Sequence, residues 1–171
     1  MSKTPIPFAS ETLETIQRAF RHASRRRHDT VGLEHLLLSI TEEPTARQQL
    51  SACGADLPSL RQSVTDVLER AFVPVPGSAS VEPEPTVAFD RVVQQAVAHA
   101  SASSATQVDT GSLLVFMLQE AESHAAYFLK THGVERLKLL RILSHGSPDG
   151  EPVPTGEPAS APTPPDPLEA Y

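Results

Sequence analysis

Gln17-Arg18-Ala19-Phe20-Arg21-His22-Ala23-Ser24 is matched by Gln94-Gln95-Ala96-Val97-Ala98-His99-Ala100-Ser101, at an offset of 77 residues. At the same offset, Leu36-Leu37-Leu38 falls on Leu113-Leu114-Val115. Several matches in register along two halves of a chain indicate an internal duplication of one supersecondary unit. The stretch between the two copies is rich in proline and small polar residues, which is typical of a linker.

Each copy has the apolar spacing of four helices. In the first copy, Pro44 suits the first turn of a third helix that Gly54 ends, and Asp56 can cap a fourth. Gly32 and Asp109 stand at equivalent helix starts in the two copies. The apolar positions expected to face inward are Leu13, Ile16, Phe20, Ala23, Leu33, Leu36, Leu37, Ile40, Leu60, Val64, Val67 and Leu68, then Phe89, Val92, Val93, Ala96, Val97, Leu113, Leu114, Met117, Leu118, Val134, Leu137, Leu140 and Leu143.

The sequence therefore predicts an all-α fold of eight helices, arranged as two pseudo-repeated four-helix motifs packed together. A unit of about 60 residues buries too little surface to be comfortable alone, so the two motifs should share a core. The expected divisions are a flexible N-terminus over 1–9, repeat one over 10–72, a linker over 73–87, repeat two over 88–146 and a disordered Pro-rich acidic tail over 147–171.

Charge and composition narrow the compartment and the class of partner. The tail over 147–171 carries five acids and no Lys or Arg, so residues 1–146 hold 14 basic against 16 acidic residues. A nearly neutral globular part argues against nucleic acid as a partner. The single cysteine, Cys53, indicates a reducing compartment, and no signal peptide or membrane-length apolar run is present. These features predict a cytoplasmic protein that is not membrane-bound.

Two candidate sites for chemistry have simpler structural explanations, and a nucleotide-binding loop is missing. No Gly-x-x-x-x-Gly-Lys-Ser/Thr loop is present, so nucleotide hydrolysis is not expected from these residues. His28 and His35, with Asp29 and Glu34, could bind a metal, but the spacing favours a packed His35 and a solvated His28, with no metal or other cofactor. Arg25-Arg26-Arg27 resembles a nucleic-acid patch, yet cations at a helix C-terminus also offset the helix dipole.

Asp29 and Glu34 flank one loop beside the arginine run. Glu34 suits the first turn of a helix, where a carboxylate is favoured by the free N–H groups. The same two acids could instead present a charged docking surface, and the residues alone leave both interpretations open.

A family resemblance is carried by four stretches of the sequence. Glu34-His35-Leu36-Leu37-Leu38-Ser39-Ile40 resembles the signature of Clp N-terminal repeats, and Phe89-Asp90-Arg91-Val92-Val93-Gln94-Gln95-Ala96-Val97 is similar to the start of the second repeat. Glu122–His132 and Ile142–Gly146 resemble the ClpA branch in particular. The resemblance extends over roughly residues 10 to 146.

This resemblance implies an accessory domain of a hexameric AAA-plus unfoldase that feeds substrates to the ClpP protease. It implies docking of a ClpS-type adaptor that delivers substrates bearing N-degrons, and an isolated domain that is monomeric. By position, the adaptor-contact residues would be Asp29, Glu34, Thr86 and Arg91. We expect the two acids and the arginine to be accessible and to form charged hydrogen bonds across an interface.

The sequence departs from the family in ways that keep alternatives open. Gly111-Ser112 stands where Glu-His would recur in the related ClpC branch, which argues against a second, phosphoarginine-reading site. The ATPase modules are missing, so contact with ClpP would have to come through them. The chain could thus be part of a longer unfoldase or a stand-alone competitor for the adaptor. Direct binding of unfolded substrate in an apolar groove is a further alternative.

Overall fold

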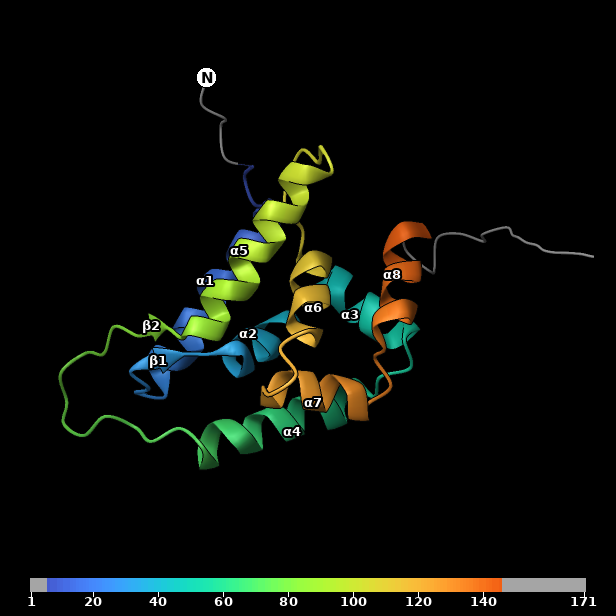
Figure 1. The fold of residues 1–171 in the computed structure, drawn as a ribbon. Helices are drawn as coiled ribbons and strands as arrows, with labels where there is room; N and C mark the ends of the chain where they lie inside the picture. Colours follow the sequence, from blue (N-terminus) through green and yellow to red (C-terminus); the bar gives the residue numbers. More distant parts are fainter. Residues whose placement is uncertain (1–5, 146–171) are drawn as a thin grey trace, which may run out of the picture.

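The computed structural model describes residues 6–145 and confirms the predicted all-α fold (Figure 1). The predicted tail over 147–171 lies outside the described residues, as do residues 1–5. The helices are α1 (Ser10–Arg25), α2 (Leu33–Ile40), α3 (Pro44–Ala52), α4 (Leu57–Arg70), α5 (Val87–Ala102), α6 (Thr110–Leu118), α7 (His124–Thr131) and α8 (Arg136–His145). Two short strands precede α2 and α5, namely β1 (Thr30–Val31) and β2 (Glu84–Pro85).

The duplication is visible in where the helices begin. α1 and α5 start 77 residues apart, at Ser10 and Val87, and α2 and α6 keep the same offset. The offset then grows to 80 between α3 and α7, because α6 is one residue longer than α2 and the connection after α6 is two residues longer than the one after α2. Even the left-handed turn residue after the first helix recurs, since Arg27 and Ser104 both have a φ of 60°.

The two repeats exchange short extended segments. β1 and β2 pair in parallel, with Val31 opposite Pro85. An isolated parallel bridge places Phe8 opposite Val108, which is the same pair with the roles of the two repeats reversed. The segment before the first helix of each repeat therefore pairs with the segment before the second helix of the other.

Residues 7–9, which the sequence assigns to a flexible N-terminus, take part in this exchange. The amide of Ala9 donates to the carbonyl of Val108 at 2.9 Å, and the amide of Val108 donates to the carbonyl of Pro7 at 2.8 Å. Because a paired backbone is held by its partner strand, these three residues belong with the folded part of the chain.

One continuous core joins both repeats, with α2 at its centre. Every residue from Val31 to Ile40 is buried, and α2 packs against α1, α4, α5 and α7. Figure 1 shows α4 and α7 lying together beside α2, one from each repeat. The expected sharing of a core is confirmed, and it explains how two units of this size form one stable body.

Two apolar residues predicted to face inward are exposed. Leu13 is 44% exposed and Leu137 is 71% exposed. On α1 the buried stripe is shifted by one position and consists of Thr12, Thr15, Ala19 and Ala23. Threonine is tolerated there because the hydroxyl of Thr12 is hydrogen-bonded to that of Thr110 at 2.9 Å, across the boundary between the repeats.

Arg27 has a more specific role than the dipole effect suggested for Arg25-Arg26-Arg27. Its guanidinium donates to the carbonyls of Val75 at 2.8 Å and Ala79 at 2.7 Å. These bonds fix the first half of the predicted linker to the turn that follows α1. The second half of the linker is held by the pairing of β2 with β1.

The hydroxyl pair between the repeats gives a test of how the shared core is held. We expect Thr12→Val and Thr110→Val each to lower the free energy of unfolding by about 1–3 kcal/mol, because each leaves one buried hydroxyl unpaired. The double variant should be more stable than the sum of the two losses predicts. An apolar pair is compatible with this place in the fold, because the residues equivalent to Thr12 and Thr110 in the other repeat, Phe89 and Leu33, are buried and apolar.

Urea denaturation of the four proteins in this cycle measures the coupling. Strict additivity of the two losses would contradict the structural role assigned to the Thr12–Thr110 bond.

Candidate functional site

The structure gathers the predicted partner-binding residues around the starts of β1, α2 and α5. Asp29 directly precedes β1, and its carbonyl accepts from the amide of Glu84 at 3.1 Å. A Cβ placed on Gly32 would lie 2.9 Å from Oε1 of Glu34 and 3.7 Å from Cγ2 of Thr86. The strand exchange thus brings Glu34 of one repeat close to Thr86 of the other.

Glu34 is buried, so the expectation that it is accessible is wrong. The residue is 8% exposed, and its Oε2 accepts from the backbone amide of His124 at 3.2 Å. The same oxygen lies 3.6 Å from Nδ1 of His124. A carboxylate at a helix start satisfies free N–H groups, and Glu34 does this for α7 rather than for its own helix.

Arg91 belongs to a second polar link in the same region. Its guanidinium donates to both carboxylate oxygens of Glu120, at 2.8 and 3.1 Å, and these bonds raise the pKa of Arg91. The Arg91 side chain remains half exposed, whereas that of Glu120 is mostly covered. The backbone carbonyl of Glu120 accepts from the amide of Ser123. This bond lies in the turn that precedes His124, the partner of Glu34.

Glu120 and His124 are therefore site residues that the sequence analysis missed. Both belong to the connection before α7 or to its first turn, where repeat two is longer than repeat one. This insertion breaks the 77-residue offset, and His124 also lies in the Glu122–His132 stretch that resembles the ClpA branch, so both features could have drawn attention to this region.

Asp29 and Thr86 complete the site in different ways. Asp29 is exposed, and within residues 6–145 no hydrogen bond or ion pair joins its carboxylate to another side chain. Thr86 caps α5, with its hydroxyl accepting from the amide of Phe89 at 3.1 Å. Beside Asp29 a cavity of about 510 Å³ opens between β1 and the segment Ala71–Pro76. Asp29 thus offers a free carboxylate next to a hollow.

A buried histidine pair lies directly behind this surface. Nδ1 of His35 accepts from the amide of Gly32 at 3.0 Å, so its Nε2 carries the proton and donates to Nδ1 of His28 at 2.9 Å. The ring of Phe72 packs against both imidazoles. His28 is 3% exposed, so the interpretation of it as a solvated loop residue is wrong, whereas the packing of His35 at a helix start is confirmed.

Both imidazoles are held neutral. Burial, with a smaller effect of the neighbouring His28, lowers the pKa of His35 to about 3. Burial also lowers the pKa of His28, helped by Arg26 and opposed by Asp29. Within residues 6–145 no three His, Cys, Asp or Glu side chains come close enough together to hold a metal ion. Nε2 of His35 and Nδ1 of His28 are already hydrogen-bonded to each other.

The second repeat has no copy of this site. The position equivalent to Glu34 is Gly111, and a Cβ there would lie 2.5 Å from Cδ2 of Leu143. The histidines are replaced by Ala105 and Ser112. The space that a second acid would need is filled by Leu143 of α8, so within residues 6–145 the duplication keeps this charged site in repeat one alone.

These features define a duplicated eight-helix domain with one polar site at the junction of its repeats. The profile of the Clp repeat (R) N-terminal domain matches residues 7–132, which is more than half of the chain. The chain therefore belongs to the Clp N-terminal domain family. It is 38% identical over 146 residues to a ClpA homolog protein of Fuscovulum blasticum, covering 82% of this chain and 18% of that protein.

Further comparisons agree with the family. Identity to the chloroplastic chaperone protein ClpC1 of Oryza sativa subsp. japonica is 26% over 166 residues, covering 88% of this chain and 18% of the relative. The chain thus spans less than a fifth of the length of the curated relatives it matches.

Solved structures share the fold. The Hsp104 N-terminal domain from Candida albicans has a TM-score of 0.69 at 12% identity, covering 82% of this chain and 94% of that one. The N-terminal domain of ClpD from Arabidopsis thaliana has a TM-score of 0.63 at 19% identity, covering 84% and 98%. Within residues 6–145, no helix combines the length and apolarity that a membrane crossing needs.

The neutral histidines predict that the domain loses stability on mild acidification. Their pKa values are lower in the folded chain, so below the ordinary value of 6.5 the unfolded chain binds more protons. Stability should be full above pH 6.5 and fall by up to about 1.4 kcal/mol per pH unit for each histidine. The lowered pKa of His22 acts in the same direction, whereas Glu42 contributes only below its ordinary 4.5.

Urea unfolding between pH 7 and 5 measures this slope. His28→Asn and His35→Asn each keep an acceptor without a titrating ring, so the slope should become shallower in both. His99→Asn, which changes an exposed histidine, serves as the control and should keep the wild-type slope. An unchanged slope in both buried variants would show that the pair is not the source.

Proposed function

We propose that this chain is an adaptor-recognition domain that docks a ClpS-type adaptor and so receives substrates bearing N-degrons. The observation that carries the proposal is the single site in which the exposed Asp29 and the half-exposed Arg91 flank the buried Glu34. An acid and a base on one surface can form complementary charged hydrogen bonds with a partner, which gives specificity and steers association.

The site residues divide between contact and support. Asp29 has a free carboxylate and lies beside a cavity, so it is suited to direct contact. Arg91 is already paired with Glu120, which fixes the orientation of its guanidinium and leaves one face for the partner. Glu34 acts mainly by fixing the start of α7 beneath the surface. Thr86 fixes the start of α5 in the same way.

Stoichiometry follows from the asymmetry of the repeats. Gly111 and the packing of Leu143 leave no acid and no room at the equivalent place in repeat two. We therefore expect one adaptor for each domain, and the asymmetry supports neither a two-site reader nor phosphoarginine recognition.

The wider role follows from the family. In a ClpA-type unfoldase, such a domain would be attached to ATPase modules and would reach ClpP only through them. A proline-rich acidic segment is suited to act as an extended tether, which raises the local concentration of captured cargo. If the chain stands alone, the same site would make it a competitor for the adaptor.

A second candidate function is direct binding of unfolded segments. A cavity of about 350 Å³ lies between α5, α6 and α8, with apolar walls formed by Val115, Phe116, Leu140 and Leu143. It lies within repeat two. One similar structure, at 17% identity and a TM-score of 0.63, is titled a complex of the ClpV N-domain with a VipB peptide.

Calorimetric titration with a ClpS-type adaptor tests the first function. Wild-type chain should bind one to one. Asp29→Ala should weaken binding by roughly tenfold or more with little change in the unfolding midpoint, since within residues 6–145 no hydrogen bond or ion pair joins its carboxylate to another side chain. Glu34→Ala should weaken binding and also destabilise the domain by about 1–3 kcal/mol, because it leaves the amide of His124 at the start of α7 without its acceptor.

Asp90→Ala is the matched control, because it removes another exposed acid close to the site. Absence of binding by the wild-type chain, or equal loss in Asp29→Ala and Asp90→Ala, would refute docking at this site.

The second function predicts a different pattern. Leu140→Glu would place a charge in the wall of the repeat-two cavity and should abolish binding of a permanently unfolded test protein, measured by fluorescence anisotropy. Asp29→Ala should leave that binding intact. If Asp29→Ala abolishes it and Leu140→Glu does not, the cavity is not the capture site.

A further inference from the structure

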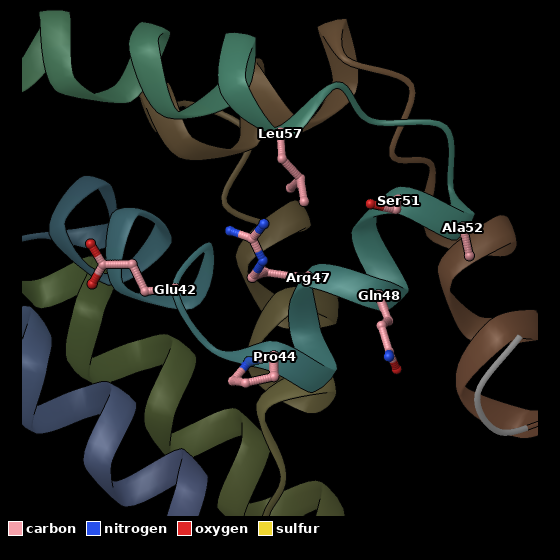
Figure 2. Close-up of a pocket in the computed structure, with 7 residues that line it drawn as sticks. All are labelled: Glu42, Pro44, Arg47, Gln48, Ser51, Ala52 and Leu57. Atoms are coloured by element: carbon pink, nitrogen blue, oxygen red, sulfur yellow. The ribbon is translucent and has the colours of Figure 1, made fainter. Parts of the chain in front are cut away.

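A polar trough runs along the outer face of repeat one, between α3 and α4. Its larger part has a volume of about 900 Å³ and is drawn in Figure 2. The lining residues there are Glu42, Pro44, Arg47, Gln48, Ser51, Ala52 and Leu57. A second hollow of about 420 Å³ continues from it over α4 and shares Arg47 and Leu57 with it. None of these residues belongs to the proposed adaptor site.

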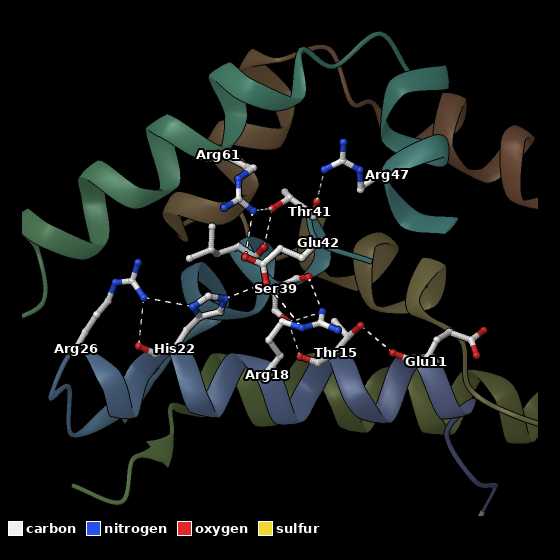
Figure 3. Close-up of polar contacts among 11 residues, drawn as sticks. Glu11, Thr15, Arg18, His22, Arg26, Ser39, Thr41, Glu42, Arg47 and Arg61 are labelled. Atoms are coloured by element: carbon white, nitrogen blue, oxygen red, sulfur yellow. Dashed lines mark hydrogen bonds and ion pairs between the residues drawn. The ribbon is translucent and has the colours of Figure 1, made fainter. Parts of the chain in front are cut away.

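Two guanidinium groups that line the trough converge on the buried Thr41. Arg47 donates to the carbonyl of Thr41 at 3.1 Å, and Arg61 donates to its hydroxyl at 3.0 Å (Figure 3). One arginine comes from α3 and the other from α4, so a single buried residue holds both. Both arginines form these bonds through Nη1, and both side chains remain partly exposed, so a partner can reach their other N–H groups.

The trough carries surplus positive charge. Glu42 is the acid in its lining, and its carboxylate is already engaged by Arg18, His22 and Arg61. Asp56, next to Leu57, accepts from the hydroxyl of Ser59. His22 is neutral, since burial lowers its pKa. Among the residues that line the two hollows, the two arginines Arg47 and Arg61 therefore outnumber the one acid, Glu42.

The chain itself supplies a segment of opposite charge. Residues 147–171 contain eight prolines, five acids and no Lys or Arg. The acids nearest to α8 are Asp149, Glu151 and Glu157, spaced among prolines. Proline rings can pack on Leu57, Pro44 and Ala52 while neighbouring carboxylates meet the arginines, so both components of the trough have a counterpart in this segment.

The place where this segment begins also suits the trough. α8 packs against α3, and Nζ of Lys138 in its first turn donates to the carbonyl of Cys53 at 2.9 Å. Figure 2 shows α8 passing beside Ala52. An extended proline-rich chain advances about 3.1 Å per residue, so the eleven residues 147–157 can span about 34 Å, whereas nine-residue α3 is about 13 Å long.

We propose that the acidic, proline-rich segment over residues 147–171 binds in cis to the Arg47–Arg61 trough between α3 and α4. Each exposed ion pair is weak, but attachment to α8 gives the segment an effective concentration on the order of millimolar. The contact is therefore populated at low ionic strength and released as salt screens it.

Paramagnetic relaxation enhancement on the full chain tests this contact. A nitroxide is attached through Ser160→Cys, while native Cys53 stays unmodified because it is buried and burial raises the pKa of its thiol. Amides of Arg47, Gln48 and Ser51 should be broadened at about 20 mM salt and recover at about 1 M salt, where the screening length falls to about 3 Å.

Three variants decide the interpretation. The broadening should fall at least twofold in Arg47→Gln, which leaves the Glu42 bonds in place, and in a chain whose five tail acids are changed to Asn or Gln. Arg70→Gln, an exposed arginine at the end of α4 outside the trough, should keep the broadening. Equal broadening in all variants, or none in the wild-type chain, overturns the proposal. So does broadening that appears only when labelled and unlabelled chains are mixed, since this indicates contact between molecules.

Discussion

The exchange of short strands between the two repeats is the constraint on which the rest of the structure depends. Phe8 pairs with Val108, and Val31 with Pro85, so neither repeat completes its own backbone pairing. A four-helix unit of this size would bury too little surface alone. The exchange makes the repeats one body and places α2 at the centre of a core to which both contribute.

The functional surface is a consequence of that exchange. Asp29 and Glu34 belong to repeat one, whereas Thr86, Arg91 and Glu120 belong to the linker and repeat two. The parallel register of β1 with β2 brings the two groups to the same edge, and the Glu34–His124 bond connects it to α7. A local change in the strands would therefore displace the site without altering any of its side chains.

The features of the fold that depend on neighbouring residues could be predicted from the sequence. Helical periodicity, caps and the 77-residue offset predicted eight helices, because each depends on residues within a few positions of one another. The burial of Glu34 could not be predicted, since its partner lies 90 residues away in an insertion. His28 was misjudged for the same reason, because Phe72 covers it from beyond α4. Leu13 followed a correct helical period but with the phase shifted by one residue.

Duplication also explains why, within residues 6–145, the buried acids and imidazoles are confined to repeat one. A buried acid or imidazole is tolerated only when its bonds are satisfied, and those of repeat one are satisfied by Gly32, by His124 of repeat two and by the His28–His35 pair. Repeat two has Ala105, Gly111 and Ser112 at the equivalent places, and Leu143 packs where the acid would be. With the core shared, one copy could become an apolar support while the other kept the charged residues. The domain thus presents one site on a scaffold built twice.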